Sequence, residues 1–436
     1  MTKVTHGQFI IVAIPIIFAN ITIPIIGLVD TAVIGHLGSA VMIAGAGMGA
    51  AFLTGLYHLF NFLMTGVTAF TSQARGGDQQ REVIKSGLRG MLLGLAIGIL
   101  ILLLHKHFFL LVFLIFPAEP VVNDLAMQYI SIRVISAPFA LANFALIGWL
   151  LALEKSSNVL VIQISVTLSN ITLDLIFVLY FAYGVSGVAL ASAISESIGF
   201  AIAIFFCRKI FIRKIIFNKS IIFSATDWAR IFKANSDIFL RTLMLECVAV
   251  SYIFIGAILG TVTQAANQIL YQFLSLTSFA LDGFAFSSQV FVGVAYGRRN
   301  LTDFRAACWM GFQWGFAGGV FLTLIILIFG ENFIEIMTVA EDVRKQANEF
   351  IFLMALTPLT GVASWILDGI FLGALKTKKL RRAMFESVVC YFFVASVSVP
   401  FIGNYGLWIS VSILFLCRAI TLLFRYRSIE YSISTT

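Results

Sequence analysis

Long apolar runs recur along the whole chain and constrain its fold more than any other feature. Two of them are Met91–Leu104 and Gly319–Phe329, and neither alternates polar with apolar residues. Apolar residues make up 60% of the 436 residues and charged residues 11%, against about 45–50% and about 25% in soluble domains. The sequence therefore predicts that lipid, rather than water, surrounds most of the chain.

Lipid leaves few folds open, because an unpaired backbone group is costly in hydrocarbon. Only helices and closed barrels pair every group, and barrel strands would alternate in polarity. The sequence thus predicts an all-α polytopic membrane protein with about twelve transmembrane helices in two pseudo-symmetric six-helix lobes. The third span is expected to end at Leu104, because His105-Lys-His107 follows it. Those two histidines are too few for a metal site.

Basic residues gather in the even-numbered connections between the expected spans. The connection at 207–235 is the longest and most basic, whereas the fifth and eleventh connections carry no basic residue. Cytoplasmic loops of membrane proteins are enriched in Lys and Arg. This pattern predicts a multi-pass bacterial inner-membrane protein with both termini in the cytoplasm and a retained first helix. The net charge of +8 is then a topology signal, not a sign of nucleic-acid binding.

The two halves of the sequence resemble each other. Ala74–Asp78 matches Ala295–Arg299, and Gly148–Lys155 matches Gly369–Lys376, both at an offset of 221 residues (295 − 74 and 369 − 148). We expect an N-terminal lobe at 1–206 with six spans, a basic cytoplasmic linker at 207–235 and a C-terminal lobe at 236–436. Parallel repeats of this kind suit transporters that hold substrate between rocking lobes.

Ionisable residues at membrane depth are functional candidates, since they are costly to insert. In the first half, Asp30 lies on a segment that Pro15 and Pro24 should bend, which makes these prolines hinge candidates. Further along, Asn170 and Asp174 share one helix face, as do Ser192 and Glu196. We interpret the polar residues as cation- or proton-coupling candidates: Asp30, Asn170, Asp174, Ser192 and Glu196.

The second half offers one cation and three acids: Arg241, Glu246, Asp282 and Asp368. They suggest a paired network around the centre of that half. A structural network and a substrate or proton role stay open as alternatives, and Arg241 also lies close enough to a helix end to snorkel.

Enzyme chemistry has little support in this sequence. The Gly45, Gly47 and Gly49 pattern lacks the phosphate-binding spacing, and close helix packing explains it better. The chain has no Walker A motif, no C-x-x-C among its five cysteines and no convergent nucleophile with a base. We therefore predict no enzymatic activity and no organic cofactor.

Three segments resemble a known family, namely Gly27–Gly38, Ala280–Ala285 and Ile366–Ala374. They are similar to the DinF-like branch of the MATE (multidrug and toxic compound extrusion) transporters. The resemblance covers nearly the whole chain and implies antiport of cationic or amphiphilic compounds against protons or sodium. It also implies that Asp30, Asn170 and Asp174 meet in space beside a proline-bent first helix, with the Ser192 hydroxyl where relatives often carry threonine.

Our mechanistic hypothesis is that Asp30 and Asp174 share a pocket of low dielectric. Burial and mutual repulsion would favour neutralising the pair, by a proton or by sodium held on Asp30, Asn170, Asp174 and Ser192. Neutralisation would relax the bend near Pro15 and release substrate outward, and we favour the proton. The alternatives are a flippase for lipid-linked precursors and, less favoured, an intramembrane enzyme. A monomer among membrane lipids suffices for this mechanism.

Overall fold

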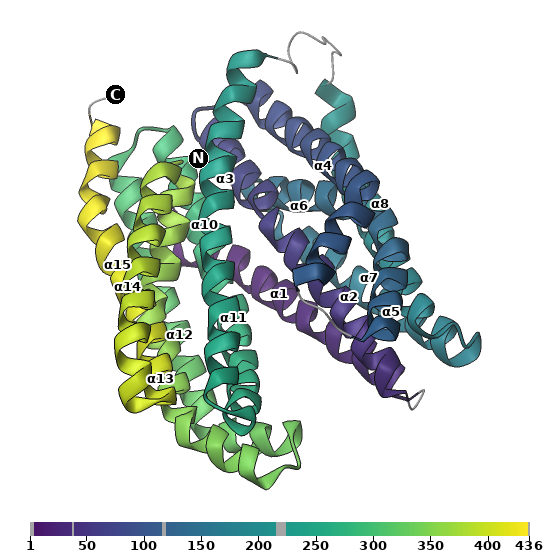
Figure 1. Ribbon diagram of the computed structural model, residues 1–436. Coiled ribbons are helices and arrows are strands. Elements are labelled where there is room, and N and C mark those ends of the chain that lie inside the picture. Colours follow the sequence, from purple (N-terminus) through teal and green to yellow (C-terminus); the bar gives the residue numbers. More distant parts are fainter. Residues whose placement is uncertain (1–3, 37–38, 116–118, 215–223, 435–436) are drawn as a thin grey trace. The chain divides into compact units, whose positions relative to one another are not determined.

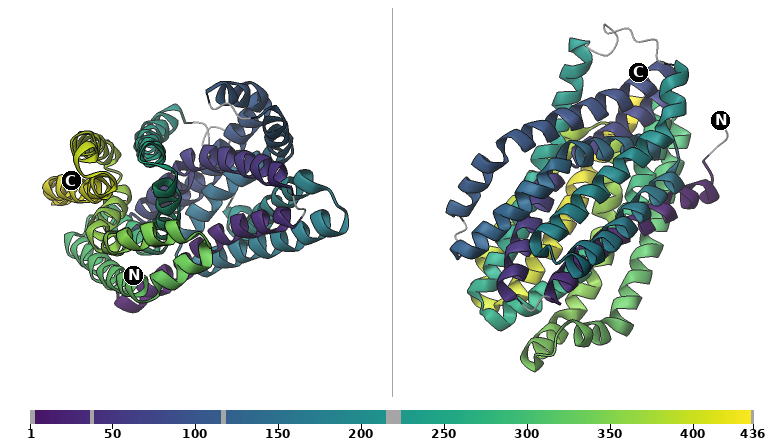
Figure 2. Two further views of the ribbon diagram at one scale, coloured as in Figure 1. Left: turned by 60° about the horizontal axis from the view of Figure 1, so that its bottom comes forward. Right: turned by 90° about the vertical axis from the view of Figure 1, so that its right-hand side faces the viewer.

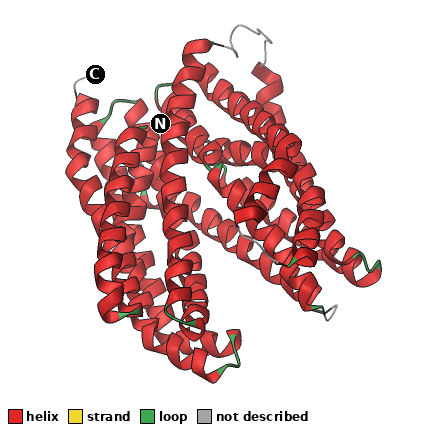
Figure 3. Ribbon diagram, viewed as in Figure 1, coloured by secondary structure: helices red, strands yellow, loops and turns green. Residues whose placement is uncertain are grey.

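The structure is a computed structural model that describes residues 4–36, 39–115, 119–214 and 224–434. Within these ranges the secondary structure is helical and no strand occurs (Figures 1 and 3). Twelve helical segments of the described chain are long and apolar enough to cross a membrane. The prediction of an all-α protein with twelve spans is confirmed.

Six spans precede residue 215. The first is α1 (His6–Gly35), and the third is α4 (Gln80–Ile115). The second span consists of α2 (Ala40–Leu59) and α3 (Phe62–Gly76), and the sixth is α8 (Gly184–Lys214). The fourth span consists of α5 (Pro120–Arg133), the 3₁₀ turn η1 (Val134–Ser136) and α6 (Ala137–Ala152). The fifth consists of α7 (Ser156–Asp174) and the π-helical segment η2 (Leu175–Tyr180).

The six spans that follow residue 223 are uninterrupted helices. They are α10 (Ala225–Ile258), α11 (Thr261–Gly297), α12 (Leu301–Met337), α13 (Glu341–Gly373), α14 (Thr377–Ile402) and α15 (Asn404–Ser434). The last two lie side by side along their length, in yellow-green and yellow in Figures 1 and 2.

The predicted end of the third span at Leu104 was wrong. Helix α4 continues to Ile115, so His105 and His107 lie inside it and not at its end. Neither a charge nor a histidine breaks a helix, and the next proline in the sequence is Pro117. Helices also extend into the basic connection, because α8 reaches Lys214 and α10 begins at Ala225. Residues 215–223 of that connection, including Lys219, lie outside the described residues.

The internal repeat reappears in the helix packing. A Cβ added to Gly148 would lie 2.2 Å from the carbonyl oxygen of Met64, and one added to Gly369 would lie 2.2 Å from that of Ala285. The two pairs are related by the same offset, since 148 + 221 = 369 and 64 + 221 = 285. Both contacts bring helices so close that any side chain larger than hydrogen would collide with backbone. The two halves therefore share their internal helix packing as well as their sequence pattern.

The described chain divides into two compact units, whose segments interleave. One comprises Met1–Ile17, Ser72–Asp78 and Phe232–Thr436, and within it α11 and α12 pack on α13. The other comprises Phe18–Thr71 and Gln79–Ile231, and within it α4 packs on α6, α2 on α5 and α7 on α8. Helix α1 thus changes unit between Ile17 and Phe18, two residues beyond Pro15.

A reciprocal backbone contact lies within the first of these units. A Cβ on Gly76 would lie 2.1 Å from the carbonyl oxygen of Val294, and a Cβ on Gly297 would lie 2.1 Å from that of Gln73. The repeat offset maps Gln73 onto Val294 and Gly76 onto Gly297 (73 + 221 and 76 + 221). The contact therefore has the self-complementary form of a two-fold interface, built from the two sequence repeats.

Candidate ion-coupling site

Helix α1 carries Asp30 into the interior of its unit. The residue is only 8% exposed although it lies one and a half turns from the end of the helix at Gly35. Both Pro15 and Pro24 lie within the bounds of this helix, which is continuous from His6 to Gly35. Asp30 is therefore a buried carboxyl on a segment whose backbone ladder lacks two donors.

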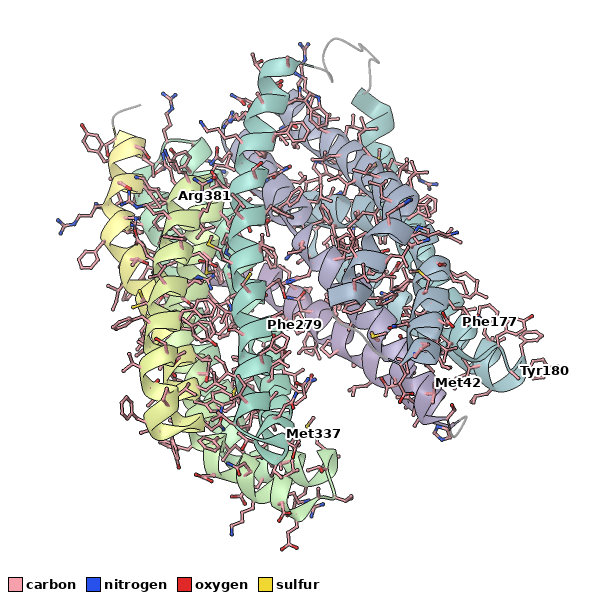
Figure 4. All side chains as sticks on the ribbon, in the orientation of Figure 1. Met42, Phe177, Tyr180, Phe279, Met337 and Arg381 are labelled. Carbon is pink, nitrogen blue, oxygen red and sulfur yellow. The ribbon has the colours of Figure 1, made fainter. Side chains whose placement is uncertain are left out.

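Helix α7 supplies two fully buried polar residues. Asn170 and Asp174 are both 0% exposed, and their spacing of four puts them on one face. Asp174 is the last residue of α7, and the π-helical segment η2 begins at the next residue. A π-helical turn is rare and is frequently found at functional sites. Figure 4 labels Phe177 and Tyr180 of that turn, which lie beyond the buried pair along the helix.

Asn170 links the two carboxyl groups. In the orientation that satisfies its surroundings, its amide nitrogen donates to Asp30 Oδ1 at 3.3 Å and to Asp174 Oδ2 at 3.3 Å. The two carboxyl groups also act on each other electrostatically. Two carboxyl groups this close repel when both are ionised, so a single proton or cation between them is favoured.

One oxygen of the pair is left without a partner. Among the described residues, Asp174 Oδ1 is buried and accepts no hydrogen bond. A buried polar atom without a partner costs about 1–3 kcal/mol. Ser192 of α8, itself 2% exposed, has its hydroxyl oxygen 3.4 Å from the Asn170 amide. In this orientation the Asn170 nitrogen faces the two carboxyl groups and its oxygen faces Ser192, so the arrangement suits a proton on the acid pair. Sodium held by all four residues would require the amide to turn its oxygen toward the acids.

Glu196 is paired with a cation of its own. Arg133 donates from Nε and Nη2 to Glu196 Oε1, at 3.1 and 2.8 Å. The Ser136 hydroxyl lies 2.5 Å from the other carboxylate oxygen. Glu196 was predicted with the coupling residues, but the structure groups it with an arginine that the sequence interpretation did not single out.

Arg133 could have been found from the sequence. It lies in the middle of the fourth span, Pro120–Ala152, whose most apolar part is the most buried of the twelve spans in the described chain. Pro138 follows it within two turns, and the helix gives way to the 3₁₀ turn η1 directly after it. An arginine in an apolar stretch followed by a proline is the signal that was available. Arg133 and Asp174 are both the last residue before an irregular turn.

The acidic candidates of the second half interact with two arginines, not one. Asp368 of α13 is 4% exposed and is paired with two arginines, Arg241 of α10 and Arg418 of α15. Arg418 Nε donates to Asp368 Oδ1 at 3.0 Å. Asp282 acts electrostatically on both arginines, and Glu246 acts electrostatically on Tyr271. The count of one cation for three acids was therefore incomplete, because Arg418 was overlooked in the last span.

Two of the three glycines in the pattern on α2 allow close packing against α5, as expected. A Cβ on Gly45 would lie 2.5 Å from Leu125 Cβ, and a Cβ on Gly49 would lie 2.9 Å from the Tyr129 ring. Gly47 has nothing within 4 Å of such an atom, so the expectation of close packing was wrong at that position. Gly49 is the position that allows Tyr129 to lie against α2.

Comparison with known proteins places this arrangement in context. The family model MatE matches the chain twice, at residues 15–176 and 238–399. DNA damage-inducible protein F of Escherichia coli (strain K12) is 33% identical over 94% of this chain and 89% of its own length. The probable multidrug resistance protein NorM of Bacillus licheniformis is 23% identical over 97% of this chain and 95% of its own length.

Solved structures share the fold at low sequence identity. A crystal structure described as MATE in the straight conformation aligns with a TM-score of 0.89 at 17% identity, over 99% of this chain and 97% of that chain. A structure described as MATE in the bent conformation aligns with a TM-score of 0.87 at 16% identity, over all of both chains. These likenesses concern the fold alone.

Proposed function

This chain belongs to the MatE family of transporters, and we propose from that membership that it is a secondary active efflux antiporter. In this proposal it exports cationic or amphiphilic small molecules across the bacterial inner membrane in exchange for protons. It is a multi-pass membrane protein with twelve apolar helices in its described residues, and its family is one of transporters and not of enzymes.

The observation that carries the proposed ion coupling is the bridge between Asp30 and Asp174. The Asn170 side-chain nitrogen donates a hydrogen bond to each of the two carboxyl groups, at 3.3 Å in both cases. In a span surrounded by lipid, a carboxyl pair of this kind can bind a proton, which neutralises one negative charge, and can later release that proton. We propose that exchange of this proton drives transport, with sodium on the same oxygens as the alternative ion.

The proposed substrates follow from the names of the relatives. NorM of Bacillus licheniformis and MdtK of Yersinia enterocolitica are both described as multidrug resistance proteins, and each aligns over more than nine-tenths of this chain. Neither name specifies a compound. Amphiphilic cations suit a chain whose spans are rich in aromatic side chains, since an aromatic face attracts a cation.

In the proposed alternating access, α1 links the movement of the two halves to the charge of the acid pair. The boundary between the two compact units falls between Ile17 and Phe18, directly after Pro15, so one helix belongs partly to each unit. Its Phe18–Gly35 portion carries Asp30. A change in the charge of the acid pair is then proposed to alter the bend at Pro15 while the two halves rock, and Pro24 serves as a second flexible point.

The proposed orientation has both termini in the cytoplasm. Twelve spans put the two ends of the described chain on the same side, and the excess of Lys and Arg in the even-numbered connections favours the cytoplasmic side. Labelling of single cysteines introduced near residue 230 and near Gly403, with an impermeant reagent on intact cells, tests this assignment. Labelling only at Gly403 is the expected result.

Reconstituted transport tests the proposed function. The purified chain in liposomes is given an imposed proton gradient, an imposed sodium gradient or neither, and uptake of a panel of fluorescent organic cations is measured. Accumulation driven by the proton gradient alone is expected. Accumulation that depends only on the sodium gradient would show that sodium is the coupling ion. Accumulation that is independent of both gradients would contradict antiport.

A further inference from the structure

Helices α14 and α15, which lie side by side, each expose a row of large apolar side chains (Figure 1). The members of the two rows are spaced three or four residues apart and are each 42–68% exposed: Phe385, Val389, Phe393, Leu416, Ile420 and Leu423. Residues at this spacing share one face of a helix. In a membrane protein, such rows provide a surface along which lipid chains can pack.

The row on α14 becomes basic toward the start of the helix. Arg382 lies three residues before Phe385, and Lys378 lies four residues before Arg382, so both continue the same face. The Arg382 side chain is 75% exposed, and Lys378 is exposed as well. The surface thus changes from apolar to cationic within about one turn, as it does where hydrocarbon meets phospholipid headgroups.

A single carboxylate joins two guanidinium groups at this end of the helix pair. Arg382 Nε of α14 and Arg425 Nη2 of α15 both donate to Glu386 Oε1, at 3.1 and 2.6 Å. Arg425 also acts electrostatically on Lys379 of α14. One negative charge therefore lies among at least three positive ones, and the excess of positive charge remains for an anion.

Nearby acids do not remove this excess, because they are paired with other cations. Glu430 of α15 is paired with Arg305 at 2.8 Å. Asp237 of α10 is paired at 2.8 Å with Arg381, which Figure 4 labels near the start of α14. The carboxylates of these two pairs are thus already neutralised by arginines outside the cluster around Glu386.

Arg382 and Lys378 retain hydrogen-bond donors for a ligand. Within the described chain, the hydrogen bond of Arg382 to Glu386 uses Nε, which leaves the donors of Nη1 and Nη2. Lys378 makes no hydrogen bond or ion pair with any described residue. The guanidinium fork matches the spacing of two phosphate oxygens, and a lysine one turn away adds a second positive charge.

The internal repeat shows that the helix pair does not need this cluster in order to pack. The offset of 221 residues maps α14 and α15 onto α7 and α8, which also pack on each other. Positions 378, 382, 386 and 425 correspond to uncharged residues in the first half: Ser157, Val161, Ser165 and Ile204. The charges are therefore particular to the second half and not a requirement of the duplicated fold.

We propose that this end of α14 and α15 binds an anionic phospholipid. Arg382 and Lys378 hold its phosphate, Arg425 adds positive charge, Glu386 orients the two guanidinium groups, and the acyl chains lie along the two apolar rows. A zwitterionic lipid offers the same phosphate, but its own cation is repelled by the cluster. The proposed orientation places the site in the cytoplasmic leaflet, and the site does not depend on the proposed antiport.

The test measures lipid binding to the purified, full-length chain in detergent. Native mass spectrometry follows titration with phosphatidylglycerol and with phosphatidylcholine of identical acyl chains. Phosphatidylglycerol is expected to bind the parent more tightly. Arg382→Gln and Lys378→Gln are each expected to weaken its binding about fivefold, the contribution of one basic side chain near an anionic headgroup. Arg382→Lys keeps the charge and should lose less than Arg382→Gln.

Arg208→Gln is the matched control, because it removes the same charge from an exposed arginine of α8, the helix that corresponds to α15. The Arg208 guanidinium carbon lies 3.9 Å from the centre of the Phe205 ring. This variant should bind phosphatidylglycerol as the parent does. Glycerol phosphate, which has the headgroup without the chains, is added as a competitor and should displace the lipid only at far higher concentrations.

Loss of phosphatidylglycerol binding in Arg382→Gln and Lys378→Gln, but not in Arg208→Gln, supports the proposal. Equal binding of the two lipids by the parent, or an equal loss in all three variants, overturns it and leaves a general attraction between charges. Displacement by glycerol phosphate at lipid-like concentrations overturns it in favour of a soluble phosphate ligand. Both substituted residues are exposed, and thermal unfolding of each variant confirms that it is folded. Transport is not measured, so failure of the proposed antiport leaves the result unchanged.

Discussion

The side-chain nitrogen of Asn170 lies 3.3 Å from Oδ1 of Asp30, so an amide on α7 reaches a carboxyl group on α1. The same nitrogen lies 3.3 Å from Asp174 Oδ2. An amide nitrogen offers only donors, so it stabilises the site best when at least one carboxyl group is ionised. The geometry therefore favours a pair that holds one proton between two acids, with Asn170 fixing their separation.

Neutral replacement of either acid is expected to uncouple transport. Asp30→Asn and Asp174→Asn each remove a site for the exchanged proton while keeping the size of the side chain. Cells that carry either variant at normal expression should lose efflux of fluorescent organic cations. Asp342→Asn, at an exposed acid in the first turn of α13, should leave efflux unchanged. Efflux at the parent rate in Asp30→Asn would remove that residue from the coupling.

The hydroxyl at position 192 is expected to matter more than the identity of the residue. Ser192→Thr keeps the oxygen that faces Asn170, whereas Ser192→Ala leaves the amide carbonyl without this donor, at a cost of about 1–3 kcal/mol. Initial rates of proton-driven uptake in liposomes should fall at least several-fold in Ser192→Ala and stay near the parent in Ser192→Thr. Equal rates in the two variants would exclude the hydroxyl from the site.

Two glycines of one helix provide a matched pair. A Cβ at Gly49 would lie 3.0 Å from the Ala126 carbonyl oxygen, whereas one at Gly47 meets nothing within 4 Å. Gly49→Ala should therefore displace α5 and Tyr129, with a loss of about 1–3 kcal/mol in the free energy of unfolding. Thermal unfolding in detergent should show a lower midpoint for Gly49→Ala and an unchanged one for Gly47→Ala. The reverse order would contradict the contact.

The aspartate between two arginines is expected to be a stability determinant. Asp368→Asn leaves Arg241 and Arg418 without the carboxylate that both contact. Removing one partner of a buried ionic group costs about 3–5 kcal/mol. Detergent-solubilised Asp368→Asn should unfold at a clearly lower temperature than the parent, and Glu331→Gln, at an exposed acid of α12, should not. A stable Asp368→Asn that has lost transport would instead indicate a direct role in the transport cycle.

The reciprocal glycine contact predicts that two distant positions respond alike. Gly76→Ala and Gly297→Ala each place a methyl group 2.1 Å from a carbonyl oxygen of the opposing segment, so the two segments must separate. Both variants should lower the thermal unfolding midpoint in detergent by a similar amount. Gly7→Ala in the same unit is the control, because nothing lies within 4 Å of its added atom. Unequal effects would argue against a two-fold contact.

Much of the fold could be predicted because hydrophobicity and repetition are properties of neighbouring residues. Runs such as Met91–Leu104 are sufficient to identify a span, and an offset of 221 residues identifies the duplication. Helix ends were less predictable. His105-Lys-His107 looked like a boundary, but α4 continues to Ile115, since local charge does not stop a helix whose backbone ladder is intact.

The residues of the candidate site could also be identified from the sequence, whereas their partners on other helices could not. Asp30, Asn170 and Asp174 were identified because polar groups are conspicuous in apolar segments, and the family resemblance implied that they meet. The partnership of Glu196 with Arg133, and of Asp368 with Arg418, depends on which helix faces come together across tens of residues. Sequence spacing relates residues along one helix only.

Composition and the internal repeat are thus enough to specify a duplicated helical membrane protein of about twelve spans, because both can be read along the chain without knowing which helices meet. The choice of counter-ions for buried charges, such as Arg133 for Glu196 and Arg418 for Asp368, arises only when separate helices pack. Burial makes such pairing obligatory, since a charge in hydrocarbon needs a partner. Only the three-dimensional arrangement decides which partner it finds.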